Sequence, residues 1–338
     1  MAKTQSFVGR LFQTYVIDAL TYMAMGLFAS LIVGTIIAQI AQIPGLELLN
    51  EIADILKSPA VVGGSIGLAI AYGFKRDALV TISAVAVGAM GYIWGGPVGA
   101  YLSAIVGVEC GSLVSKRTPV DIIVTPITSI VPAGLFAKFC CVPINEWVMS
   151  LGDVINEATT LNPFVMGIVV SVLVGCALTL PISSVALCVT IGISGLAAGA
   201  ATVGCCAQMV GFAVISFKDN GVSGLVSQGV GTSMLQIGNI VRKPIIWLAP
   251  TLTSAILGPI STCIFKMTNS AAAAGMGTSG LVGPIGCWAD MSATTDHMLL
   301  LAQILGLYFV APAVISLLIH YAMKRVGWVK AGDMQLQR

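Results

Sequence analysis

Charged side chains are scarce in this sequence. Of its 338 residues only 9% are Asp, Glu, Lys or Arg and 57% are hydrophobic, whereas soluble domains carry about 25% charged residues. Residues 158–217 contain no charged residue at all, and six further charge-free runs each exceed 20 residues. A hydrocarbon core about 30 Å thick is crossed by roughly 20 apolar helical residues. The composition therefore excludes a soluble enzyme, a nucleic-acid-binding protein and a disordered chain, and it predicts an all-α polytopic membrane protein.

Motifs for catalysis or metal binding are also lacking. The sequence has only two histidines and contains no Walker loop, H-E-x-x-H motif or C-x-x-C motif. Its nine cysteines lie in or beside apolar runs, where Cys most often packs as a small side chain. We therefore predict no catalytic residue of its own, no metal site and no cofactor.

The apolar runs predict about 10–12 transmembrane segments. Their expected bounds are residues 19–40, 59–74, 78–95, 97–115, 120–142, 162–180, 181–198, 200–217, 221–241, 245–265, 271–288 and 298–323. Short Gly-rich segments among them could instead be re-entrant hairpins, whose backbone must be buried by neighbouring helices or wetted by water.

Basic residues flank these segments unevenly. Lys75, Arg76, Lys116 and Arg117 follow the second and fourth segments and more basic residues follow the last, whereas residues 143–161 carry three acidic residues and no base. Because Lys and Arg are enriched in cytoplasmic loops, we expect both termini to be cytoplasmic and the acidic loop to be external.

An internal repeat is the more informative feature. MGLFASLIVGTII at 25–37 matches MGIVVSVLVGCAL at 166–178 with five identities, and at an offset of 125 Gly99, Arg117 and Pro119 fall on Gly224, Arg242 and Pro244. With five crossings in each half, the second repeat would be inverted, as in many secondary transporters. Chance likeness between Gly-rich helices is the alternative. Inversion would also place Arg242 and Lys243 outside, against the positive-inside rule, unless that segment is a hairpin or faces a cavity.

The expected layout is one transmembrane domain over 1–325. It comprises repeat one at 15–142, the acidic loop at 143–161, repeat two at 162–265, a terminal hairpin and helix at 268–323, and a cytoplasmic tail at 326–338.

Glu109 is the strongest candidate site residue because it lies well inside an apolar segment, where an ionisable group is costly. It could accept hydrogen bonds from substrate hydroxyls or carry a proton. Alternatively it could be a packing carboxylate paired with Lys116, Arg117 or a backbone amide.

Two Gly-rich stretches supply the other candidates. GVGTSMLQIGNIVRKP (229–244) offers Gln236 and Asn239, whose amides both donate and accept hydrogen bonds and so suit sugar hydroxyls. TNSAAAAGMGTSGLVGPIG (268–286) offers Asn269, Thr278 and Ser279 in a segment whose glycines allow a broken helix that exposes backbone groups. Interhelical packing through small and polar residues is the alternative for both stretches.

At 118–137 (TPVDIIVTPITSIVPAGLFA), 229–244 and 268–286 the sequence resembles the membrane IIC subunits of the bacterial sugar phosphotransferase system. It looks most like their stand-alone branch, the IIC-like or perfringolysin-regulator-like membrane proteins. The resemblance covers roughly 14–325. It implies a homodimeric permease in the bacterial cytoplasmic membrane, without a cofactor, that hands a sugar to separate IIB and IIA phosphotransferase proteins.

In related sugar IIC proteins an intramembrane Glu and a His hold the sugar. Glu109 matches the Glu, whereas His297 falls in a predicted loop and His320 near a segment end. The expected function is therefore a IIC-type permease that binds a small polar solute, a sugar or sugar-like molecule, and moves it by alternating access. An uncoupled transporter of another solute and a membrane sensor that regulates gene expression are the alternatives.

Overall fold

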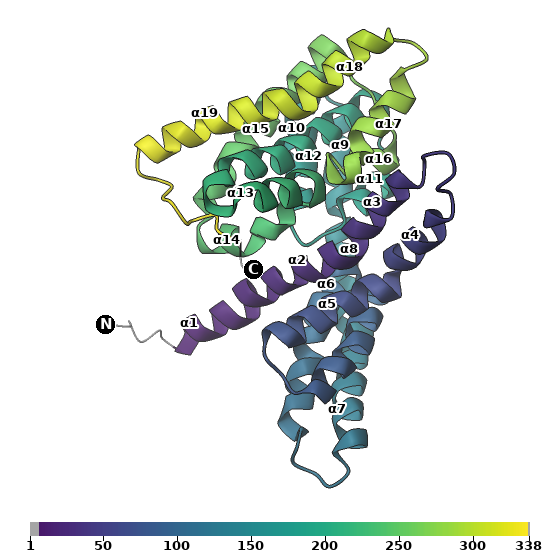
Figure 1. Ribbon diagram of the computed structural model, residues 1–338, viewed down its shortest axis with the longest axis vertical. Helices are drawn as coiled ribbons and strands as arrows, with labels where there is room; N and C mark the ends of the chain where they lie inside the picture. Colours follow the sequence, from purple (N-terminus) through teal and green to yellow (C-terminus); the bar gives the residue numbers. More distant parts are fainter. Residues whose placement is uncertain (1–6, 337–338) are drawn as a thin grey trace. The chain divides into compact units, whose positions relative to one another are not determined.

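The computed structural model describes residues 7–336, and the chain is helical along most of this length (Figure 1). Within these residues the only β-structure is one isolated bridge between Gly195 and Asn269. The chain divides into two compact units between Val148 and Met149, and each unit is described by itself below.

Six helices within residues 7–336 are long and apolar enough to cross a membrane. They are Val8–Ile40, Ala78–Val114, Asp121–Thr159, Gly195–Ile215, Pro244–Phe265 and His297–Arg325. The pair Leu49–Lys57 and Pro59–Gly73, bent by 58° at its break, would make a seventh. An all-helical membrane protein is thereby confirmed. The continuous spans are fewer than the 10–12 predicted, because some predicted segments share one helix and others are interrupted.

Unit 1 consists of long helices, two of which, Val8–Ile40 and Asp121–Thr159, contain more than one of the elements named here. Its main elements are α2 (Ala19–Leu27), α3 (Val33–Ile40), α4 (Leu49–Lys57), α5 (Pro59–Gly73), α6 (Ala78–Val114), α7 (Asp121–Phe136) and α8 (Val142–Met149). Gly63 of α5 lies against Gly88 of α6, and Gly67 lies against Ala84, so the two helices run in opposite directions. A Cβ on Gly67 would lie 2.0 Å from the Ala84 carbonyl oxygen, which shows that the two backbones are in direct contact.

Helix α6 is itself a hairpin. At Gly96 the backbone has φ 60° and ψ −158°, a conformation essentially restricted to glycine. Pro97 then starts the second arm, where its missing N–H costs nothing. The arms face each other, with Gly91 against Gly99 and Val87 against Gly107. They correspond to the segments predicted at 78–95 and 97–115.

Unit 2 is built around α12 (Gly195–Ile215), most of whose residues are buried. Helices α10 (Pro163–Thr179), α15 (Leu248–Pro259), α18 (His297–Leu305) and α19 (Ala311–Arg325) complete its frame. Gly204 of α12 packs against Ser171 of α10, and Thr179 hydrogen-bonds Gln208 further along, so these two helices are parallel. Because they are parallel, the chain between them must return along the unit.

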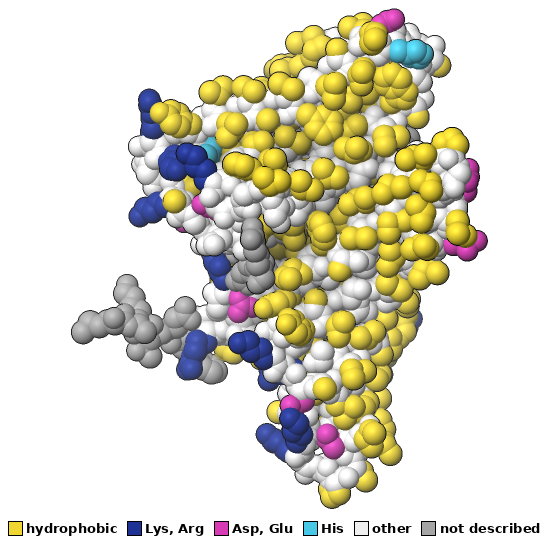
Figure 2. Space-filling model, viewed as in Figure 1, with side chains coloured by type: hydrophobic (Ala, Val, Ile, Leu, Met, Phe, Trp, Pro, Cys, Tyr) yellow, Lys and Arg dark blue, Asp and Glu magenta, His cyan; other side chains and the backbone are white. Residues whose placement is uncertain are grey.

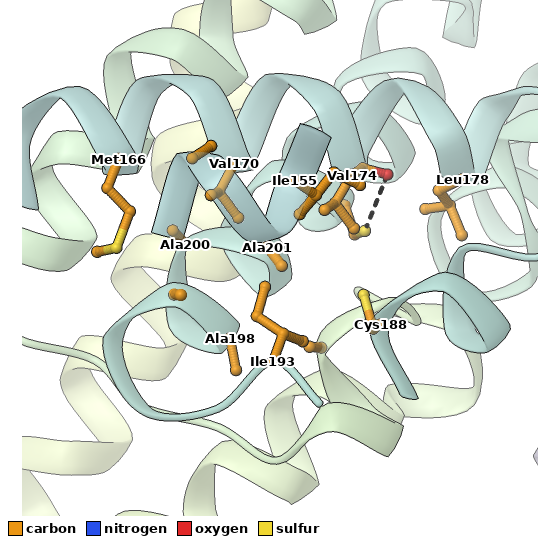
Figure 3. Close-up of a cluster of buried hydrophobic side chains, with 14 of the residues drawn as sticks. Ile155, Met166, Val170, Val174, Leu178, Cys188, Ile193, Ala198, Ala200 and Ala201 are labelled. Carbon is orange, nitrogen blue, oxygen red and sulfur yellow. Dashed lines mark hydrogen bonds between the residues drawn. The ribbon is translucent and has the colours of Figure 1, made fainter. Parts of the chain in front are cut away.

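Small side chains let α12 pack closely in the core. Ala198, Ala200 and Ala201 meet Val170 and Val174 of α10 in a cluster of buried hydrophobic residues (Figure 3). The Cys205 thiol also donates to the Val174 carbonyl at 3.7 Å.

Three predicted segments of this unit are not continuous helices. Residues 181–198 hold only α11 (Ser184–Thr190) before α12 starts. Residues 221–241 divide among α13 (Phe217–Val226), single turns and α14 (Ile237–Arg242), and residues 271–288 divide among α16 (Ala271–Ala274), a turn and α17 (Val282–Met291). Glycines with positive φ at 192, 277 and 280 interrupt the first and third of these segments, since helical φ is negative, whereas the second is interrupted at Thr232, whose backbone is extended.

The predicted acidic loop at 143–161 also differs from expectation. It is helical, formed by α8 and by α9 (Leu151–Thr159), and the division between the units falls inside it. Leu, Met, Ala and Glu favour helix in this stretch, which has one internal glycine.

The surface agrees with a membrane environment. Hydrophobic side chains cover much of the visible face, and charged side chains gather in a few patches near its margins (Figure 2). The exposed hydrophobic residues include Ile122 at 75%, Phe139 at 73% and Met298 at 79%.

Candidate functional site

Glu109 lies on the second arm of α6, and its carboxylate forms an ion pair with Arg76. Arg76 precedes the first arm, so the hairpin brings together two residues that are 33 positions apart. The guanidinium of Arg76 also lies 5.9 Å from the centre of the Phe74 ring, which Tyr15 meets edge-on. The Glu109 side chain keeps 34% of its surface exposed. Glu109 therefore has a charged partner, although a different one from those that the packing alternative named.

Lys116 instead pairs with Asp77 at the open end of the same hairpin. The Lys116 ammonium and the Ser115 hydroxyl hold the pKa of Asp77 below its ordinary value. Two ion pairs, Arg76–Glu109 and Lys116–Asp77, thus join the arms near this end.

Asn269, Thr278 and Ser279 lie in the broken segment between the end of α15's π-helical extension and α17. Asn269 donates to Thr202 of α12 at 2.9 Å and to the Gly283 carbonyl at 3.0 Å, so it ties this segment to the core. Thr278 donates to the Gly229 carbonyl at 2.5 Å, which links the segment to the second broken stretch. The Ser279 hydroxyl is buried and, among the described residues, has no hydrogen-bond partner.

Gln236 and Asn239 belong to a chain of buried amides. Asn239 donates to Gln236 at 2.8 Å and Gln236 donates to Gln228 at 2.8 Å, and Gln228 in turn donates to Ser216. The same two amides also donate to the C-terminal segment, Gln236 to the Met334 carbonyl at 3.0 Å and Asn239 to the Gln335 carbonyl at 3.0 Å. The structure thus brings these two predicted site residues together, but with the protein's own tail as their partner.

The tail is held by further contacts from the same region. Asp219 accepts hydrogen bonds from the backbone N–H groups of Gly332 and Met334, and Lys243 pairs with Asp333. Burial tends to raise the pKa of Asp333, but Lys243 and the Lys330 N–H hold it below its ordinary value. The segment 217–243 therefore begins and ends at the same end of unit 2, beside the C-terminal tail. This geometry agrees with the hairpin alternative for Arg242 and Lys243.

One polar residue of this unit was not singled out from the sequence. Gln208 of α12 is fully buried, and its carbonyl oxygen accepts from the Trp247 indole at 2.9 Å and from Thr179 at 3.3 Å. Thr179 also hydrogen-bonds Ser233 in the broken stretch, which places Gln208 next to the amide chain. The indole N–H of Trp247 is therefore used inside the unit. The sequence feature that could have identified Gln208 is that it is the single Gln in the charge-free run 158–217.

A family model described as "Phosphotransferase system, EIIC" matches residues 17–336, nearly the entire chain. The protein belongs to the phosphotransferase system EIIC family. No curated protein and no solved structure matches the chain significantly. The EIIC family implies a sugar substrate and IIA and IIB partner proteins, and together with the apolar helices it identifies an integral membrane transport component.

The candidate residues of this EIIC protein thus fall into two groups. Glu109 lies in unit 1, whereas Gln236, Asn239, Asn269, Thr278 and Ser279 all lie in unit 2 and are linked through Gly229 and the amide chain. Among residues 7–336 no group of three or more His, Cys, Asp or Glu side chains is placed to hold a metal ion.

Proposed function

We propose that this EIIC protein is a permease that binds a sugar or a similar polyhydroxylated solute and moves it across the bacterial cytoplasmic membrane by alternating access. A separate IIB protein would phosphorylate the solute as it is released inside. The family supports the transport role, and the candidate site in unit 2 supports the class of solute.

The observation that carries the proposal is the meeting of two broken helical stretches in unit 2. Residues 227–236 and 275–281 touch through the Thr278–Gly229 hydrogen bond, and both contact α12, Gly277 beside Cys205 and Gly229 beside Ala213. Breaks of this kind expose backbone donors and acceptors at membrane depth, where transporters bind their substrates. The hydrogen-bonding groups at this meeting point are neutral hydroxyl, amide and backbone groups, beside Met209 and Cys205 of α12, and such groups suit solute hydroxyls better than ions.

The buried Ser279 hydroxyl gives the site an unused hydrogen-bonding group. A buried polar atom without a partner costs about 1–3 kcal/mol, and binding a solute hydroxyl there would recover part of that cost. We place Ser279 and Thr278 in direct contact with the solute and Asn269 as the residue that holds their segment.

Glu109, in unit 1, is proposed as a separate solute-binding residue, which becomes available when its pairing with Arg76 opens. The two-repeat plan and the homodimer remain part of this proposal. Gly96 and Gly221, which are 125 residues apart as the repeat predicts, share nearly identical backbone angles (φ 60° and 63°, both with ψ −158°). The similarity between the two repeats is weaker after these glycines, because residues 97–114 form a continuous helix whereas residues 222–242 form an interrupted one.

Uptake into proteoliposomes tests the proposal. A panel of labelled hexoses, hexitols and disaccharides would be offered with and without IIA, IIB and phosphoenolpyruvate. Accumulation of phosphorylated sugar that requires IIB supports the coupled permease, and equal uptake of free sugar without IIB indicates an uncoupled transporter. Binding of a sugar without uptake would favour the sensor, and absence of both uptake and binding for the whole panel would contradict the proposed class of solute.

Two variants test the site itself. Ser279→Ala should weaken binding of the transported sugar about tenfold if its hydroxyl contacts the solute. Ser261→Ala is the matched control, because Ser261 is also buried with an unpartnered hydroxyl but lies in the π-helical turn Ile260–Phe265. Equal effects of the two substitutions would remove Ser279 from the site, and unchanged binding in Glu109→Gln would remove Glu109.

A further inference from the structure

The C-terminal tail is bound to unit 2 mainly through its backbone. Besides the bonds to Gln236, Asn239 and Asp219, Asn220 donates to the Met334 carbonyl at 2.8 Å and accepts from the Leu336 N–H at 2.8 Å. Main-chain N–H and C=O groups of residues 332–336 therefore satisfy the side chains of the segment 217–243.

Two side chains of the tail add to this attachment. Met334 is only 2% exposed and packs in a cluster with Phe212, Ile215 and Ile246. Asp333 is 21% exposed and pairs with Lys243, whose side chain is 31% exposed. Salt screens a partly buried ion pair less than an exposed one. The Lys243–Asp333 pair therefore helps to hold the tail in place.

The amides that hold the tail are those best suited to a polyhydroxylated solute. Gln236 and Asn239 donate to two peptide carbonyls, and sugar hydroxyl oxygens are acceptors of the same kind. While the tail is bound, these donors are occupied, and the broken stretch to which they belong is fixed to the end of the chain.

We propose that residues 332–336 form a displaceable strap. Bound, the strap occupies Gln236 and Asn239 and immobilises the segment 217–243; released, it frees both and lets the broken stretch move during transport. The effect on transport rests on the proposed function, whereas the binding and release of the strap do not.

Hydrogen–deuterium exchange on the full chain in lipid nanodiscs tests the strap. In the wild type the amides of Gly332, Met334 and Leu336 should be protected. Lys243→Asp and Asp333→Lys should each speed their exchange about tenfold, because a charge-assisted hydrogen bond is replaced by like charges. The double variant K243D/D333K should restore protection, and Lys324→Asp, an exposed change of the same charge on α19, should leave it unaltered.

The exchange of residues 227–239 decides whether the strap controls this stretch. It should accelerate in both single variants and in a chain that ends at Lys330. Wild-type tail amides that exchange at the unprotected rate would overturn the strap. A released tail with unchanged exchange over 227–239 would overturn its control of the segment.

Uptake of the sugar panel by the chain ending at Lys330 should exceed that of the wild type. If the wild type transports nothing, the permease function fails, but the exchange measurements still decide the strap.

Discussion

Buried polar side chains in unit 2 are of two kinds, those paired within the chain and those without a partner. Gln208, Gln228, Gln236 and Asn239 belong to the first kind, and Ser279 to the second. In a low-dielectric interior a satisfied network fixes one arrangement of its members, whereas an unsatisfied group favours a ligand that can pair with it. This difference separates the residues that build the site from those we expect to contact the solute.

Gln208→Met should destabilise the protein by about 1–3 kcal/mol, because it leaves the Trp247 N–H without its acceptor, whereas the Thr179 hydroxyl keeps its bond to Ser233. Thermal unfolding in detergent measures the change. Gln303→Met is the control, since the carbonyl oxygen of Gln303 is buried without a partner and its loss removes no described bond. A similar loss of stability in both variants would contradict the structural role of Gln208.

For single residues, the sequence predicted which polar side chains would lie inside apolar segments, but it did not predict which residues they contact. Glu109 stood out because it interrupts an apolar segment, but its partner Arg76 lies 33 positions away and is brought near only by the hairpin. The tail contacts of Gln236 and Asn239 were likewise beyond prediction, because they join positions almost 100 residues apart.

Helical elements in this chain end or turn where glycine permits a backbone that other residues avoid. Gly96 and Gly221 have the same unusual angles, one at the tip of the α6 hairpin and the other within α13. In unit 1 the sequence predicted the helices well, since the positive-φ turn at Gly96 falls between two predicted segments. In unit 2 glycines with positive φ, such as Gly277 and Gly280, fall inside an apolar run, so hydropathy predicted a continuous helix where the backbone is broken.

Gly96→Ala and Gly221→Ala should each cost about 1–3 kcal/mol of stability, because the new Cβ makes this backbone conformation strained. At Gly221 the cost comes from the backbone alone, as no atom lies within 4 Å of the added Cβ. Gly306→Ala, which also meets no atom within 4 Å but has helical angles, should be neutral or slightly stabilising. Denaturant unfolding compares the three, and equal stabilities would contradict the role assigned to the two turns.

For the molecule as a whole, the distribution of Lys and Arg predicts which helix ends face the cytoplasm. The α6 hairpin of unit 1 allows this orientation to be tested. The arms of α6 have 17 and 18 residues, 78–94 and 97–114, and are therefore about 25 Å long. That length nearly matches a hydrocarbon core, so we expect both arms to cross and the Lys116 end to be cytoplasmic.

Cysteine labelling tests this orientation. In a chain whose exposed Cys140 and Cys263 are replaced by Ser, Lys116→Cys should react with a membrane-impermeant maleimide only from the cytoplasmic side. Asn145→Cys, beside the Gly96 turn, should react only from the opposite side. Reaction of both from one side would show that the α6 hairpin is re-entrant, and the unsubstituted parent should react from neither.

The attachment of the tail also has a consequence for biosynthesis. Leu336 hydrogen-bonds Asn220, which is translated 116 residues earlier, and Gln236 and Asn239 find acceptors on residues translated almost 100 positions later. Chains fold from the N-terminus during synthesis, so most of unit 2 enters the membrane with these amides still unsatisfied. Folding of this polar centre therefore waits for residues 332–336, and a chain that lacks them would leave Gln236 and Asn239 without these two acceptors.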